Sequence, residues 1–176
     1  MLPEPLHPAV VHFPLVLAFL LPMFALGGLW AIGRGARPTR GWTLPFAFAA
    51  VLAASAWLAL ETGESEEERV EDVVTGAALH EHEEAGERFL VLSGLLLVVA
   101  GVGFFGGTVG AAGRVLTAVG SVGVLAAGIA VGAAGGELVY RHGAAGPYVT
   151  AAAGASGFSP AEAPADASRG QEEDDD

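Results

Sequence analysis

Five histidines are the side chains of this 176-residue chain best suited to cofactor or metal chemistry, because the sequence contains no cysteine. Neutral imidazole is a ligand for haem iron, copper and non-haem iron. The missing cysteine excludes thiolate sites, disulfides and covalent haem attachment. No nucleophile–base pair, phosphate-binding loop or metalloprotease motif accompanies the histidines. Whether the protein is an enzyme therefore stays open, with the balance against it.

His12 is the first candidate ligand, because its motif places an ionisable group at the start of an apolar stretch. Pro14 has no N–H to donate to the carbonyl of Val10, so an acceptor is left free close to His12. An ionisable side chain at membrane depth is a functional-site candidate by default. A structural histidine bonded to that carbonyl and a role in proton handling remain as alternatives.

His82 is the second candidate, because it falls on the apolar face of its expected helix. It shares a helical stripe with Leu79 and Phe89, whereas His80 falls on the opposite side with Glu84. We therefore expect His82 to face the other helices and His80 to face water. His12 and His82 form the predicted ligand pair for haem b or a transition metal.

Other side chains at the same helix ends are expected to support this pair. Gly63 is read as the C-cap of the second long helix, just after its last membrane-depth carboxylate. Helix capping just before Gly143 is one explanation for His142, and anchoring at the membrane interface is one for Tyr140. The supporting set is His7, Glu61, Glu137, Tyr140 and His142.

Four apolar stretches must position these residues. They cover about 10–32, 42–60, 89–110 and 115–136, in a chain that is 52% hydrophobic and only 16% charged. A bilayer core needs roughly 20 apolar residues at 1.5 Å each. The expected fold class is therefore an all-α integral membrane four-helix bundle over residues 1–143.

The acidic residues lie between and after these stretches. An acidic extracytoplasmic loop is expected at 61–87, and a disordered acidic tail at 144–176, where the composition cannot form a packed core. The net charge of −12 argues against a nucleic-acid partner, since phosphate binding needs clustered positive charge. The lipid bilayer is the expected partner.

The arginines set the expected orientation, since acidic residues count little in the positive-inside rule. Arg34, Arg37 and Arg40 lie in the first connection, and Arg114 is assigned to the third. Both connections are therefore expected in the cytoplasm, with the N- and C-termini outside a prokaryotic cytoplasmic (plasma) membrane. Trp42 is expected to mark the inner membrane interface.

Glycines on the last apolar stretch indicate close helix packing. Gly128, Gly132 and Gly136 form two overlapping GxxxG steps on one face. Packing within the bundle is the favoured interpretation, and a homo-oligomer seam is the alternative.

Four motifs at these helix ends resemble a prokaryotic family of small membrane proteins, domain of unknown function 2231. They span about residues 6 to 143. The resemblance implies a four-helix bundle in a prokaryotic cytoplasmic membrane, and members also occur joined to or beside redox modules. It implies no particular activity. The motifs are His7-Pro8-x-x-Val11-His12-Phe13-Pro14, Thr62-Gly63-Glu64, His82-Glu83-Glu84-Ala85-Gly86-Glu87 and Gly136-x-Leu138-Val139-Tyr140-x-His142-Gly143.

Two functions of different kinds remain open. The first is a redox-associated module that binds haem or a metal through His12 and His82 and works with an extracytoplasmic redox protein. The second is a non-catalytic membrane anchor whose acidic loop and tail dock a positively charged extracytoplasmic partner. A small transporter or proton conductor has less support, because the helices carry no charge at mid-depth and no inverted repeat is evident.

Overall fold

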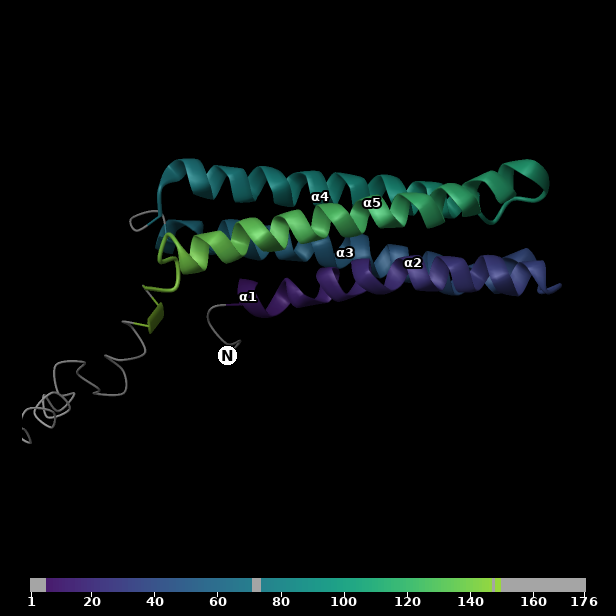
Figure 1. The fold of residues 1–176 in the computed structure, drawn as a ribbon, viewed down its shortest axis with the longest axis horizontal. Coiled ribbons are helices and arrows are strands. Elements are labelled where there is room, and N and C mark those ends of the chain that lie inside the picture. Colours follow the sequence, from purple (N-terminus) through teal and green to yellow (C-terminus); the bar gives the residue numbers. More distant parts are fainter. Residues whose placement is uncertain (1–5, 71–73, 147, 150–176) are drawn as a thin grey trace, which may run out of the picture. The chain divides into compact units, whose positions relative to one another are not determined.

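The regular elements of the protein are all α-helices within the part of the chain that the computed structural model describes, residues 6–70, 74–146 and 148–149. They lie in one compact unit that extends to Ala144 (Figure 1). The predicted all-α class is confirmed. The helices are α1 (His7–Val10), α2 (His12–Gly33), α3 (Pro38–Val70), α4 (Gly76–Val102) and α5 (Gly107–Tyr140).

Four of the helices form an antiparallel bundle. Helix α2 packs against α3 and α5, and α4 packs against the same two helices, so that α2 and α4 lie diagonally across the bundle. The short α1 leads into α2 and also packs against α3. All four long segments are long and apolar enough to cross a membrane.

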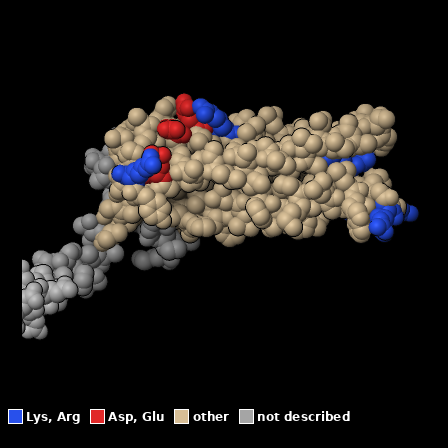
Figure 2. Space-filling view, viewed as in Figure 1, with Lys and Arg blue, Asp and Glu red and all other residues tan. Residues whose placement is uncertain are grey.

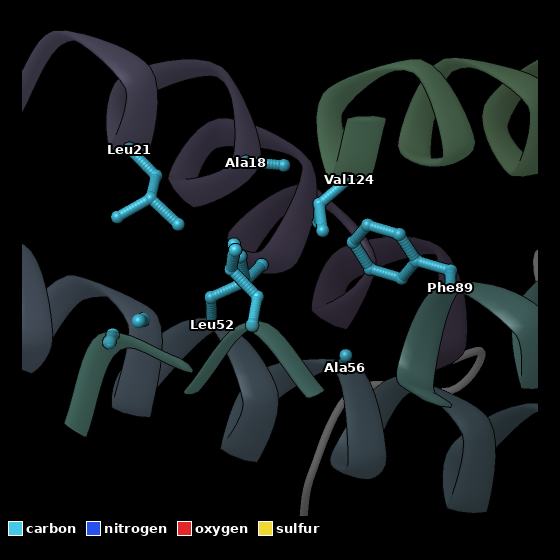
Figure 3. Packing of buried hydrophobic residues seen from close by; sticks show 9 residues of the cluster. Ala18, Leu21, Leu52, Ala56, Phe89 and Val124 are labelled. Atoms are coloured by element: carbon cyan, nitrogen blue, oxygen red, sulfur yellow. The ribbon is translucent and has the colours of Figure 1, made fainter. Parts of the chain in front are cut away.

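The bundle keeps its small side chains inside and many of its large apolar side chains outside. Ala18, Leu21, Leu52 and Ala56 meet in the core, together with Phe89 from α4 (Figure 3). In contrast, Phe13 and Val98 are each 68% exposed, as are many other large apolar residues along the outer faces. Such a continuous apolar exterior fits contact with lipid tails and not with water.

The acidic segment at 61–87, predicted as the connection between the second and third spanning helices, is largely helical. Helix α3 runs without a break to Val70 and α4 already begins at Gly76, so most of the acidic segment is helical. Glutamate and alanine are good helix formers, and solvent-exposed carboxylates do not interrupt a helix. Gly63 is accordingly an interior helical residue and not a C-cap.

The predicted third segment, 89–110, also ends in the wrong place. Helix α4 stops at Val102, and α5 starts at Gly107, which has a φ of +66°. The turn lies in apolar sequence, so composition alone did not mark it; a glycine with positive φ closes it. Most of the predicted tail, residues 150–176, lies outside the described residues.

Two side chains close the end of the bundle at this turn. The Trp42 indole is fully buried and donates a hydrogen bond from Nε1 to the Ala100 carbonyl at 2.9 Å. The buried Arg114 donates from Nη1 to the Gly103 carbonyl at 2.6 Å. Both groups satisfy carbonyls at the C-terminus of α4. Trp42 therefore lies inside the bundle, and Arg114, which was predicted in the third connection, lies within α5.

Candidate functional site

The candidate site lies at the opposite end of the bundle, where α1 is fastened to α3. The Glu66 carboxylate, on α3, accepts hydrogen bonds through Oε1 from the backbone N–H of Leu6 at 2.6 Å and of His7 at 3.1 Å. A carboxylate at this position caps the first turn of α1 and complements its dipole. Only Val11 separates α1 from α2, and its dihedral angles are helical (φ −59°, ψ −22°), so α2 continues from α1. Pro14, which lacks the N–H of a regular turn, lies three residues further on.

The His7 ring is held in one orientation by α3. Its Nδ1 lies 2.9 Å from the Ala59 carbonyl and 3.3 Å from the Thr62 hydroxyl oxygen. Because a carbonyl oxygen only accepts, Nδ1 of His7 carries the hydrogen and donates it to Ala59. In the neutral ring this leaves Nε2 with a free lone pair, the arrangement typical of metal-binding histidines.

The His82 ring lies next to His7, with one nitrogen unsatisfied. The two ring centroids are 6.2 Å apart and the ring planes are nearly perpendicular, at 85°. Nδ1 of His82 is buried and has no hydrogen-bond partner among the described residues. The ring also has a backbone hydrogen-bonding contact with Val131 on α5. A buried polar atom without a partner in a native fold calls for an explanation, such as a ligand, an ion or a water molecule.

Each histidine ring rests on a glycine of a neighbouring helix. A Cβ atom added at Gly63 would lie 3.1 Å from Cε1 of His7, and one added at Gly135 would lie 3.1 Å from Cε1 of His82. Both contacts are tighter than ordinary van der Waals separation, so any side chain at either position would move the ring. The backbones of α3 and α5 therefore set the positions of the two rings.

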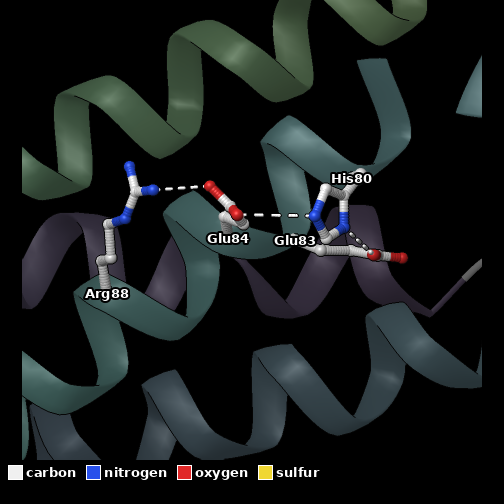
Figure 4. Close-up of polar contacts among 4 residues, drawn as sticks. All are labelled: His80, Glu83, Glu84 and Arg88. Carbon is white, nitrogen blue, oxygen red and sulfur yellow. Dashed lines mark hydrogen bonds and ion pairs between the residues drawn. The ribbon is translucent and has the colours of Figure 1, made fainter. Parts of the chain in front are cut away.

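The rim around this pair is acidic. His80 faces outward, with its ring nitrogens 3.7 Å from Glu83 and 3.4 Å from Glu84 (Figure 4). Arg88 forms an exposed ion pair with Glu84 at 2.5 Å, and Glu67 on α3 lies beside Glu83. Figure 2 shows acidic side chains gathered towards one end of the visible face, beside arginines. Such a rim attracts cations and repels anions.

The structure pairs His82 with a different partner from the predicted one. His82 is half-buried and His80 is exposed, as the helical stripe predicted. His12, however, is exposed on α2, and His7 takes the place beside His82. Val11 between α1 and α2 keeps helical dihedral angles, and five residues span about 140° around a helix, so only one of the two histidines can face His82.

The remaining predicted site residues lie around the rim and not between the rings. Glu61 is exposed, Glu137 forms an exposed ion pair with Arg141 at 2.8 Å, and Tyr140 is 90% exposed. His142 lies just past α5, where its backbone N–H donates to the Glu137 carbonyl at 3.3 Å. These residues contribute charge and helix capping.

Only part of the predicted glycine face packs closely against other helices of the bundle. A Cβ at Gly128 would lie 3.2 Å from the Phe89 ring and 3.5 Å from Leu15, and one at Gly132 would lie 3.8 Å from Leu15. Gly136 has no atom within 4 Å of such a Cβ among the described residues. The packing interpretation therefore holds for Gly128 and weakens along the helix towards the site.

Sequence reasoning missed the groups that fix the rings. Glu66, Thr62 and Gly135 were not selected, and Gly63 was read as a helix end. The signal for Gly63 and Thr62 was present, because both belong to a motif of the family resemblance. No pattern in a single sequence distinguishes Gly135 from the many other glycines of α5.

The histidine pair has no third ligand side chain beside it. No cluster of three or more potential ligand side chains forms within the described part of the chain. One turn further into the bundle, a Cβ at Gly86 on α4 would be 3.5 Å from Leu60 on α3, so the helices are already in contact. A porphyrin between the rings would have to separate α3 from α4.

Comparisons with known proteins give no match: no family model, curated protein or solved structure is similar to this chain.

Proposed function

We propose that the protein is a redox-associated membrane module that binds one transition-metal ion between His7 and His82. The observation that carries the proposal is the buried, unpartnered Nδ1 of His82 beside His7, whose own Nδ1 is committed to the Ala59 carbonyl. Each ring thus has one nitrogen available to a ligand, and the two rings are neighbours. An ion bound there would satisfy the orphaned nitrogen.

The separation of the rings suits an ion held by two imidazoles. Metal–nitrogen bonds of about 2 Å on both sides would place the ring centroids about 6 Å apart. The distance between the His7 and His82 centroids is 6.2 Å. The rings would still have to turn so that both nitrogens face the ion.

The donor set favours a metal of low charge. Both donors are neutral, and the Glu66 carboxylate beside His7 already accepts hydrogen bonds from the backbone of Leu6 and His7. Burial of a highly charged ion without anionic ligands is costly. Copper is among the first-row metals that imidazole binds. In its monovalent state it carries a single charge, so Cu⁺ is the ion we assign.

The family resemblance supports the location of the site. Its motifs supply His7, Thr62, Gly63 and His82, and these four residues lie together at one end of the bundle. We place this end on the outer side of a prokaryotic cytoplasmic membrane, because the arginines of the first connection lie at the opposite end. An extracytoplasmic redox protein is the partner that such a position would serve.

Metal binding by the purified full-length protein tests the proposal. We expect one Cu⁺ per chain in an anaerobic titration against a chromophoric chelator, with affinity reduced at least about 100-fold in His7→Ala and in His82→Ala. His12→Ala and His80→Ala are the matched controls, since both side chains are exposed, and they should bind as the wild type does.

Three results would overturn the proposal. One is Cu⁺ binding that His7→Ala and His82→Ala leave unchanged. Another is a Soret band in protein purified from native membranes, which would indicate haem. The third is protein that binds neither metal nor haem, which would favour the docking-subunit interpretation.

A further inference from the structure

The second surface of interest is the basic end of the bundle, which we define as Arg34, Arg37 and Arg40 around the α2–α3 connection. All three arginines are exposed. Gly35 closes the turn with a φ of +98°, and its backbone N–H donates to the Ile32 carbonyl at 2.9 Å. This tight turn holds the three positive side chains at one edge of the bundle, and Figure 2 shows arginine at the end of the molecule opposite the acidic side chains.

The basic end lacks acidic neighbours in its own sequence. No Asp or Glu occurs anywhere from residue 5 to 60 or from 88 to 136, the stretches that build this half of the bundle. At the other end, by contrast, Arg88 pairs with Glu84 and Arg141 pairs with Glu137. Arg114 adds a fourth positive charge, and its Nη1 donates a hydrogen bond to the Gly103 carbonyl, not to a carboxylate. The counterions of the basic end must therefore come from outside this part of the chain.

Trp30 sets the depth of this surface. Its ring is 64% exposed, and the Arg34 guanidinium carbon lies 5.0 Å from the ring centroid. An exposed tryptophan one turn from the end of a spanning helix belongs at the level of the lipid headgroups. The cation–π contact keeps Arg34 at the same level. Arg37 and Arg40 flank the N-terminus of α3, whose dipole also favours an anion there.

We propose that the basic end binds the phosphate headgroups of anionic phospholipids through Arg34, Arg37 and Arg40. Guanidinium groups bind phosphate oxygens in pairs, and the apolar helix faces directly below accept the acyl chains. Lipid phosphate supplies the missing counterions at the depth that Trp30 defines. This inference does not depend on the proposed function of the histidine pair.

Lipid binding to the detergent-solubilised full-length protein tests the inference. Phosphatidylglycerol and phosphatidylcholine with the same acyl chains are titrated separately, and bound lipid is counted by native mass spectrometry. We expect phosphatidylglycerol to bind at least about tenfold more tightly. Each arginine contributes about fivefold near an anionic surface, so Arg34→Gln, Arg37→Gln and Arg40→Gln combined should weaken binding about 100-fold.

The opposite end of the bundle supplies the matched control. Arg88→Gln combined with Arg141→Gln removes two exposed arginines that already have acidic partners, and phosphatidylglycerol binding should be unchanged. Arg37→Gln alone, an exposed position, serves if the triple variant does not fold, and it should show the single fivefold loss. Equal binding of the two lipids, or an undiminished preference in the triple variant, would overturn the inference. Inorganic phosphate that competes at concentrations comparable to the lipid would show that free phosphate, and not a lipid headgroup, is the ligand.

Discussion

Gly135 and Gly136 are adjacent on α5, yet a methyl group at each should have a different effect. At Gly136 an added Cβ meets no described atom within 4 Å, whereas at Gly135 it lies 3.1 Å from Cε1 and 3.5 Å from Nδ1 of His82. Alanine is about 1 kcal/mol better than glycine inside a helix, so both substitutions gain that amount from propensity. Only Gly135→Ala must also displace the His82 ring.

The magnitude follows from these two contributions. Overpacking of a close contact costs about 1–3 kcal/mol, so Gly136→Ala should stabilise by about 1 kcal/mol and Gly135→Ala should range from neutral to about 2 kcal/mol destabilised. For a chain of this size 1 kcal/mol corresponds to about 2–4 °C in Tm. The two variants should therefore differ by at least about 2 °C.

Thermal unfolding of both variants in the same detergent, followed by circular dichroism, measures this difference. Equal Tm values would show that His82 does not lie against Gly135, and the structural reasoning would fail. Cu⁺ affinity of the folded variants gives a separate test. We expect about a tenfold loss in Gly135→Ala alone. A destabilised Gly135→Ala that binds Cu⁺ as the wild type does would leave the packing intact and contradict the metal proposal.

Two further substitutions test other contacts at the two ends of the bundle. Glu66→Ala removes the acceptor for the backbone N–H groups of Leu6 and His7, so it should lower the unfolding free energy by about 1 kcal/mol. Hydrogen exchange in the first turn of α1 should also become faster. Glu64→Ala, at an exposed position, should change neither the stability nor the exchange rate. Gly103→Ala should destabilise the protein by about 3 kcal/mol, because its Cβ would overlap the Trp42 indole and break the hydrogen bond from Trp42 to the Ala100 carbonyl. Gly106→Ala is the control, since its Cβ meets nothing within 4 Å among the described residues. Similar Tm values for these two variants would contradict the position of Trp42.

The four long helices were predictable because apolar length alone identifies them. Their ends were not. Gly63 was predicted to be the C-cap of the second helix, yet α3 continues past it, and the missing side chain leaves room for the His7 ring. The turn before Gly107 was missed for the opposite reason, since no polar residue marks it.

The candidate site was predictable as a location and not as a set of contacts. The helical stripe correctly predicted that His82 faces inward and His80 outward, because the direction of each side chain around one helix follows from the local sequence alone. The partner of His82 depends on how α1 joins α2 and on how α1 lies against α3. Glu66, 59 residues away from His7 in the sequence, decides that position through backbone hydrogen bonds. Contacts over such separations have no signature in a single sequence.

The histidine pair also has a consequence for biogenesis. His7 is synthesised in the first spanning segment, its anchors Ala59 and Thr62 in the second, His82 in the third and its support Gly135 in the fourth. A nascent chain that has inserted three segments already contains both imidazoles, but the backbone that holds His82 is still missing. Whatever binds between the rings therefore meets a finished site only after the last helix has entered the bundle, so that occupancy would report completed assembly.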